Sequence, residues 1–234
     1  MATFVLVHGA WHGGWCWQRV APRLRAVGHD VLTPTLTGLG DRSHLLSPLV
    51  GLSTHVEDLL GTLTYAGRDD VVLVGHSYAG QVITGAASAR PDGIRKLVYL
   101  DAFVADDGDR AIDLLPANVA VHYRESVAER GFGWLIPPRP LDVLGVEDPD
   151  DVAWLESHFV PHPWRTYTDP VTVTPAGSAV PAVFVECTDW LRVFEPFAKV
   201  AASRGWPVHE LSSGHESMVT NPAGLADVLL EIAA

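Results

Sequence analysis

The chain has 234 residues, 47% hydrophobic and 19% charged, with 28 acidic against 16 basic side chains and a formal net charge of −12. This length and composition predict one folded domain with an insertion and exclude a disordered chain. The negative charge disfavours a surface for nucleic acid or for anionic lipid. No apolar run reaches the roughly 18 residues that a membrane span needs, so we expect no membrane partner.

The two cysteines, Cys16 and Cys187, are too few for a disulfide framework, which favours a reducing compartment. Strand-like residues begin at Thr3 and leave no room for a signal peptide before them. We therefore expect a cytoplasmic location. The sequence does not determine the oligomeric state, and a homodimer stays open.

Buried-strand runs and helical periodicities alternate along most of the chain. Strands are predicted at residues 3–7, 29–33, 71–74, 94–100, 181–187 and 208–211, and helices at 17–27, 53–66, 79–90, 190–204 and 222–232. Repeated strand–helix units predict an α/β fold with a mostly parallel sheet flanked by helices.

Residues 104–179 break this alternation, because prolines become dense and aromatic residues are scattered among them. We interpret them as a lid, or cap, inserted into a core made of residues 1–103 and 180–234, with short helices near 113–129 and 150–157. Aromatic residues in a mobile cover suit an apolar substrate, and Trp134 is one candidate for the pocket. Any single aromatic of this segment could equally pack the lid against the core.

The sequence VVLVGHSYAG at residues 71–80 joins a buried strand to a helix through a sharp turn that carries Ser77. This geometry lifts a serine hydroxyl clear of a sheet edge and predicts a nucleophile. Side chains larger than those of Gly75, Ala79 and Gly80 would collide where the strand and helix pass. The usual G-x-S-x-G pattern has alanine in its fifth position here. The alternative is a buried strand whose turn happens to contain a serine.

A glycine-rich loop, HGAWHGGW at residues 8–15, follows the first strand. It lacks both the Lys-Ser/Thr ending of a P-loop and the G-x-G-x-x-G spacing of a dinucleotide site. We expect the backbone N–H groups of Ala10 and Tyr78 to hold an oxyanion. The side chains of Trp11 and Tyr78 are expected to line the substrate pocket. A plain tight loop is the alternative.

Ser77, Asp189 and His215 each follow a predicted strand at its carboxyl end, where sites gather in such sheets. Their order along the chain is the one expected for a nucleophile, an acid and a base on this fold. His215 would take the proton of Ser77 while Asp189 orients its ring. Asp101 also follows a strand and is the rival acid.

The other histidines near these motifs have structural explanations. His76 is expected to pack, because neighbours in such a turn point apart, and His8 and His12 are expected to order the glycine-rich loop. The chain contains no H-E-x-x-H pair, so we expect no metal, and the predicted chemistry needs no cofactor.

Together these motifs resemble the α/β-hydrolase superfamily, and within it the branch of plant methyl-ester esterases of the salicylate type and hydroxynitrile lyases with their bacterial relatives. The opening FVLVHGAWHGGW at residues 4–15 is similar to that of the esterases, and GHS at residues 75–77 matches their nucleophile turn. CTD at residues 187–189 resembles their acid segment with one residue missing before the aspartate. Gly214 stands before His215 where the esterases usually have aspartate.

One group of lyases in this branch has threonine in the position of Ala10 and lysine directly after the catalytic histidine. Here Ala10 is apolar and Glu216 follows His215, and a carboxylate would repel a departing cyanide. The resemblance therefore implies a serine carboxylic-ester hydrolase that forms an acyl-enzyme with a small-to-medium apolar or aromatic ester. A lyase or other secondary-metabolism enzyme on this scaffold, and a slow-turnover ligand receptor, are the alternatives.

Overall fold

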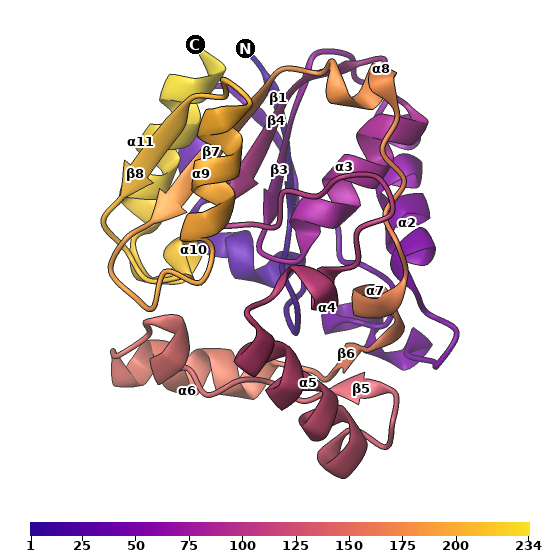
Figure 1. Cartoon of the computed structure of the whole chain (residues 1–234). Helices are drawn as coiled ribbons and strands as arrows, with labels where there is room; N and C mark the ends of the chain where they lie inside the picture. The colour runs from indigo at the N-terminus through magenta and orange to yellow at the C-terminus, as the bar shows by residue number, and fades with distance from the viewer.

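A six-stranded parallel sheet in the order β2-β1-β3-β4-β7-β8 forms the centre of the computed structural model, which describes all of residues 1–234 (Figure 1). The strands are β1 (Thr3–Val7), β2 (Asp30–Leu32), β3 (Val71–His76), β4 (Ile94–Leu100), β7 (Ala182–Cys187) and β8 (Val208–Leu211). The predicted mostly parallel sheet is confirmed.

The inner strands are apolar because both of their faces are covered. Every residue of β1, β3 and β7 is buried, which matches their unbroken hydrophobic runs. β3 pairs with β1 on one side and with β4 on the other, so the turn after β3 lies at the middle of the sheet edge. This position fixes where a nucleophile after β3 must lie.

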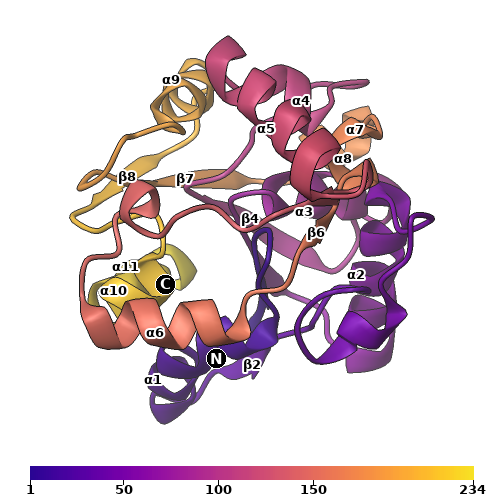
Figure 2. The same cartoon turned by 90° about the horizontal axis from the view of Figure 1, so that it is seen from below.

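Helices cover both faces of the sheet, with α1 and α11 on one face and α2, α3 and α9 on the other (Figure 2). The core helices and 3₁₀ helices are η1 (Gly14–Arg19), α1 (Ala21–Ala26), η2 (Gly40–Leu45), α2 (Leu52–Ala66), α3 (Ala79–Ala89), α9 (Glu195–Ser203), α10 (Ser217–Thr220) and α11 (Pro222–Ala233). Local signals set several of these boundaries. The predicted first helix is divided between η1 and α1 just before Pro22, and Asn221 caps α11 by accepting the Gly224 N–H at 3.0 Å.

The segment between β4 and β7 departs from strand–helix alternation. It contains α4 (Ala111–Leu114), α5 (Ala117–Arg130), β5 (Leu135–Ile136), η3 (Asp142–Leu144), α6 (Pro149–His158), β6 (His162–Pro163), α7 (Arg165–Thr168) and α8 (Pro175–Ser178). Its α5 and α6 lie beyond the carboxyl ends of the strands, whereas α7 and α8 return along α2 and α3 (Figure 1). We refer to residues 104–179 as the inserted segment. No helix of the chain combines the length and the hydropathy of a membrane span.

Candidate active site

Ser77 sits on a strained turn between β3 and α3. Its φ is +55°, a left-handed conformation that a non-glycine residue adopts rarely and that is common at functional sites. A Cβ on Gly75 would come 2.7 Å from the Ala79 carbonyl oxygen, and a Cβ on Gly80 would collide with that of Phe103. The small residues around Ser77 therefore have the steric role that the sequence predicts, and the turn brings the serine to the edge of a cavity.

His215 lies in the loop after β8 and is held by a buried carboxylate. Its Nδ1 is 2.6 Å from Oδ2 of Asp101, which is completely buried at the end of β4. The His215 ring packs against both Trp190 and Phe194, with centroids 4.5 and 5.2 Å away. Since the carboxylate accepts the Nδ1 proton, Nε2 is left as the nitrogen that can take a proton.

Asp101 is anchored as firmly as the histidine that it holds. Its Oδ1 accepts the Cys187 N–H at 3.3 Å, and its own N–H donates to the Val185 carbonyl at 2.7 Å. Its φ of +42° turns the side chain off the strand direction. Burial raises the pKa of Asp101, and the hydrogen bond from His215 works against that increase.

The expectation that Asp189 orients His215 is wrong. Asp189 is exposed, and its carboxylate accepts hydrogen bonds from Thr188 Oγ1 at 3.1 Å and Ser212 Oγ at 2.5 Å. The physical reason lies in the loop after β7, where the Asp189 N–H donates to the Ser213 carbonyl and the side chain stays in solvent. The rival Asp101 occupies the position of the acid. A buried strand ending in aspartate was the sequence signal for it.

The glycine-rich loop lies over the nucleophile turn and is fixed from several sides. Neither the Ala10 nor the Tyr78 backbone N–H donates a hydrogen bond within the protein, so both donors are free for a ligand. Trp11, at φ +69°, donates its indole N–H to the Ile136 carbonyl at 3.1 Å. The Val160 N–H donates to the Trp11 carbonyl, also at 3.1 Å. The inserted segment thus holds this loop at two points.

Two histidines order the loop, as the sequence predicts. His8 donates from Nδ1 to the Gly9 carbonyl at 2.8 Å and accepts the Leu36 N–H at Nε2. Burial lowers the pKa of His8 to about 3, so it remains a neutral hydrogen-bonding group. His12 donates from Nδ1 to the Ala10 carbonyl at 2.6 Å.

The other face of His12 meets Glu216, the residue after His215. Nε2 of His12 lies 2.9 Å from Oε2 of Glu216, and both side chains are 1% exposed. The two atoms are not aligned as a hydrogen bond, and their contact is an ion pair when His12 carries a proton on both ring nitrogens. Burial acts to raise the pKa of Glu216, but the combined effect of His12, His76 and His215 lowers it to about 2. No sequence motif predicts this pair, because its members lie on separate loops.

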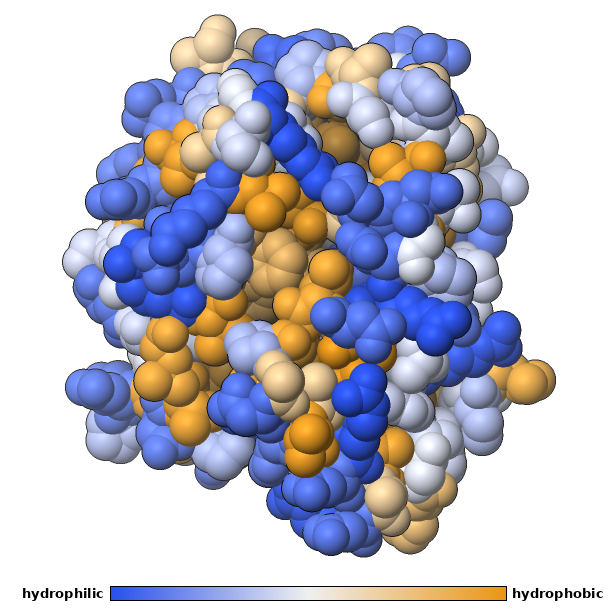
Figure 3. Space-filling view, viewed as in Figure 1, coloured by the Kyte–Doolittle hydropathy of each residue, from blue (hydrophilic) through white to orange (hydrophobic).

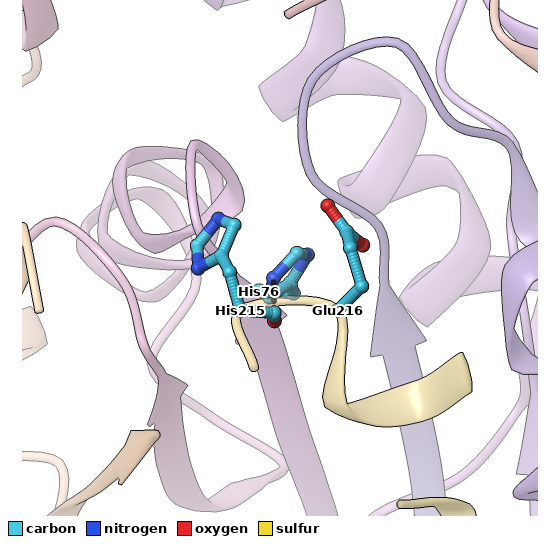
Figure 4. A group of neighbouring side chains, drawn as sticks. All are labelled: His76, His215 and Glu216. Atoms are coloured by element: carbon cyan, nitrogen blue, oxygen red, sulfur yellow. Dashed lines mark hydrogen bonds between the residues drawn. The ribbon is translucent and has the colours of Figure 1, made fainter. Parts of the chain in front are cut away.

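His76, His215 and Glu216 each offer a ligand atom within 4.8 Å of the others, an arrangement that could hold a metal ion (Figure 4). These groups already have other partners. His215 bonds to Asp101, Glu216 pairs with His12, and His76 donates from Nε2 to the His215 carbonyl at 3.0 Å. Because each of the three side chains already has at least one such partner in the protein, we assign no metal to the group.

A cavity of about 90 Å³ opens beside Ser77 and His215, and Figure 3 shows a hollow with hydrophobic surroundings on this face. Most of its lining is apolar and comes from both the core and the inserted segment: Trp11, Ser77, Phe103, Leu115, Val119, Tyr123, Arg139, Val143, Leu144, Tyr167, Trp190, Leu191, Val193, Phe194 and His215. A larger cavity of about 390 Å³ lies next to Tyr99 and Trp206 and contains none of the predicted site residues.

Of the three predicted pocket side chains, only Trp11 lies in this lining. Tyr78 is completely buried, with its hydroxyl 3.0 Å from His55 Nδ1 and its ring stacked on Tyr167, so its side chain points away from the cavity. Trp134 lies just before β5, where its carbonyl accepts the Trp164 N–H. The pocket contribution of the inserted segment comes instead from Leu115 and α5, from the residues around η3, and from Tyr167 of α7.

The chain matches the model of the alpha/beta hydrolase family over residues 4–228. It is 42% identical to a carbendazim-hydrolysing esterase of Nocardioides sp. (strain SG-4G), over 98% of both chains. It is 38% identical to methylesterase 4 of Arabidopsis thaliana over 55% of this chain and 48% of that protein.

Among solved structures, an extracellular alpha/beta-hydrolase from a Paenibacillus species superposes with a TM-score of 0.87 at 23% identity, over 99% of this chain and 98% of that one. That protein shares structural and functional homology with tobacco salicylic acid binding protein 2. The chain belongs to the α/β-hydrolase family. The predicted family and fold are confirmed, and the esterase relatives support the predicted class of carboxylic-ester hydrolase.

Proposed function

We propose that this protein hydrolyses carboxylic esters through an acyl-enzyme on Ser77, with His215 as the base and Asp101 as the residue that orients it. The observation that carries this proposal is the convergence of three groups, two of them at one cavity and the third directly behind the histidine. A serine on a strained turn and a histidine line the same apolar cavity, and a buried carboxylate holds the histidine 2.6 Å away. The full-length esterase relative supports it.

The reaction follows from this geometry. As the Ser77 hydroxyl attacks the ester carbonyl, Nε2 of His215 takes its proton, and the Asp101 carboxylate stabilises the resulting imidazolium. The free N–H groups of Ala10 and Tyr78 hold the negative charge that develops on the carbonyl oxygen. His215 then returns the proton to the departing alcohol. A water molecule, activated by the same histidine, hydrolyses the acyl-enzyme.

We propose an apolar or aromatic ester of small to medium size as the substrate. The apolar lining favours such groups, and a cavity of about 90 Å³ holds only a small part of one. A larger substrate requires the inserted segment to move, since that segment contributes Leu115 to Leu144 of the lining. We therefore assign residues 104–179 the role of a lid over the core of residues 1–103 and 180–234.

A reducing, cytoplasmic setting is consistent with the two cysteines. Cys16 and Cys187 are both buried free thiols, and burial raises the pKa of each well above its ordinary value. Neither is therefore a reactive thiolate competing with Ser77.

The cyanohydrin-lyase alternative loses its support at the site. Glu216 is not in the cavity lining and faces His12, so no charged group after His215 reaches a leaving cyanide. The expectation that the Glu216 carboxylate repels cyanide is therefore wrong, because this group does not line the substrate cavity. The absence of a lysine directly after His215 still disfavours a lyase.

The test is a panel of p-nitrophenyl and aromatic methyl esters, with carbendazim included, assayed with the wild type and Ser77→Ala. We expect turnover by the wild type and a loss of roughly 10⁴-fold or more in Ser77→Ala. A thermal melt of each protein establishes that both are folded. Turnover that survives in Ser77→Ala would contradict the nucleophile assignment. A folded wild type that binds these esters without turnover would favour the receptor alternative.

A further inference from the structure

Arg139 carries the only fixed charge in the lining of the cavity that contains Ser77 and His215. The lining holds no aspartate or glutamate, and apart from the histidine its other members are apolar or hydroxyl-bearing. A cation placed among such residues is costly unless something pairs with it.

Within the protein, Arg139 has no such partner. No carboxylate oxygen lies within 4.0 Å of its nitrogens, and its Nε is buried without a hydrogen-bond acceptor. Its one specific contact is with an aromatic face, the ring of Tyr123, whose centroid is 5.6 Å from Cζ. The guanidinium group therefore keeps its donors free for another molecule.

The phenols beside it do not supply the missing negative charge. Burial raises the pKa of Tyr123 to about 12, and burial likewise raises that of Tyr167 well above its ordinary value. Both remain neutral at physiological pH, so neither acts as the counter-ion of Arg139.

The backbone around Arg139 is rigid. Pro137 and Pro138 precede it and Pro140 follows it, and each proline ring fixes its own φ. This stretch joins β5 to η3, the same part of the inserted segment that brings Val143 and Leu144 into the lining. This backbone limits the positions from which the Arg139 side chain extends, and its contact with the Tyr123 ring limits them further, which reduces the entropy lost on binding.

We propose that Arg139 binds a carboxylate at the end of the ester substrate remote from the scissile bond, so that the preferred substrates are half-esters of dicarboxylic acids. This inference rests on the proposed ester hydrolysis and names its substrate class. A planar guanidinium group matches a carboxylate with two parallel hydrogen bonds. The apolar lining between Arg139 and Ser77 accepts the hydrocarbon part of such a molecule. Because the whole chain carries a net charge of −12, attraction of an anion to this cavity must come from a local cation.

The experiment compares monomethyl half-esters of dicarboxylic acids, from succinate to suberate, with methyl alkanoates of the same number of heavy atoms. Release of acid is followed by titration at constant pH. In the wild type we expect kcat/KM for the half-ester of the best chain length to exceed that of its neutral counterpart by about 10- to 100-fold. Arg139→Met should abolish this preference, because it lowers kcat/KM for the half-ester far more than kcat/KM for the alkanoate.

Two further variants separate charge from geometry. Arg139→Lys keeps the charge but not the planar fork, and its preference should be intermediate. Arg130→Gln is the matched control, because Arg130 also belongs to the inserted segment, pairs with Ser126 and lies outside this lining. It should leave the preference unchanged. A preference that falls equally in Arg130→Gln would overturn the assignment, since it would then reflect overall charge.

Binding tests the subsite separately from catalysis. Calorimetry with Ser77→Ala and with Ser77→Ala/Arg139→Met should show half-ester affinity about tenfold or more weaker in the double variant. If the wild type hydrolyses no ester but this difference appears, the subsite stands and the proposed reaction falls. If esters are hydrolysed with no half-ester preference, or if the two affinities agree, the reaction stands and the subsite falls.

Discussion

Two buried carboxylate–histidine pairs lie near Ser77, the proposed nucleophile, and they differ in what the histidine does with its second nitrogen. Asp101 holds His215 at 2.6 Å, and Glu216 holds His12 at 2.9 Å. The His215 ring belongs to the cavity lining, whereas Nδ1 of His12 is used in a hydrogen bond to the Ala10 carbonyl. We propose that the Asp101–His215 pair supplies a proton acceptor. The Glu216–His12 pair, which we call the brace, holds the Ala10 loop in place.

The two carboxyl groups also respond to burial in opposite ways. Burial dominates at Asp101 and raises its pKa, whereas the neighbouring histidines outweigh burial at Glu216 and lower its pKa to about 2. Ionised Asp101, in the pair proposed to serve the chemistry, is therefore electrostatically disfavoured, whereas ionised Glu216 is electrostatically stabilised. Burial of a carboxylate beside a histidine is therefore not enough to identify a catalytic acid; the free nitrogen has to reach the cavity.

The largest expected effect separates Asp101 from the acid predicted from the sequence. Asp101→Asn should lower kcat by about 10⁴-fold, because the amide favours the wrong tautomer of His215. Asp189→Asn should stay within about threefold of the wild type, since Asp189 is exposed and bonded to Thr188 and Ser212. Initial rates on the best ester of the panel decide between them. A large loss in Asp189→Asn with a small one in Asp101→Asn would reverse the assignment.

The next effect concerns the stability of the brace. Since the folded pKa of Glu216 is about 2, below its ordinary value of 4.5, its ionised form stabilises the fold above pH 4.5, and this contribution disappears as the pH falls toward 2. The full contribution of ionised Glu216 to the free energy of unfolding is about 3 kcal/mol. Urea unfolding of the wild type and Glu216→Gln should show a difference in unfolding free energy that is constant near pH 7 and shrinks below pH 4.5. A difference that is independent of pH would mean that Glu216 is not ionised in the folded protein.

Glu216→Gln should also affect catalysis, though far less than Asp101→Asn. Without Glu216, His12 holds the Ala10 loop less well. An oxyanion donor that is displaced raises the activation barrier by less than one that is removed. We expect kcat to fall about tenfold with KM changed less than about threefold, because the oxyanion contact strengthens in the transition state. Glu216→Asp should recover part of the loss if the carboxylate positions the loop. An increase in KM alone would instead indicate general damage to the cavity.

The comparison also shows which features the sequence could predict. Ser77 is predicted from adjacent residues, because a buried strand, a sharp turn and small neighbours all lie within ten positions, and the family and esterase class agree with the relatives found. The acid could not be chosen from two aspartates that both follow strands. The choice depends on the positive φ of Asp101 and on the path of the loop that carries His215, and neither leaves a periodic pattern.

The Glu216–His12 pair and the cavity lining could not be predicted from the sequence, for a related reason. Glu216 and His12 are 204 positions apart, and nothing local to either one indicates the other. Trp134 was a poor choice for the pocket because the inserted segment has no regular period from which a buried face could be assigned. Arg139 gave no sequence signal, since its role follows only from the absence of a carboxylate around it in three dimensions.

The smallest expected effect is the pH dependence of the stability that the Asp101–His215 pair confers. Because the folded pKa of Asp101 is raised above its ordinary value of 3.8, ionisation costs the folded state more than the unfolded chain. The wild type should therefore lose stability relative to Asp101→Asn as the pH rises through 3.8 to the folded pKa, and the difference should level off above it. This sign is opposite to that at Glu216, so one set of urea titrations at pH 3 to 7 tests both. The two quantities are the differences in unfolding free energy between the wild type and Glu216→Gln and between the wild type and Asp101→Asn. If both changed in the same direction over this range, the electrostatic distinction between the two pairs would fail.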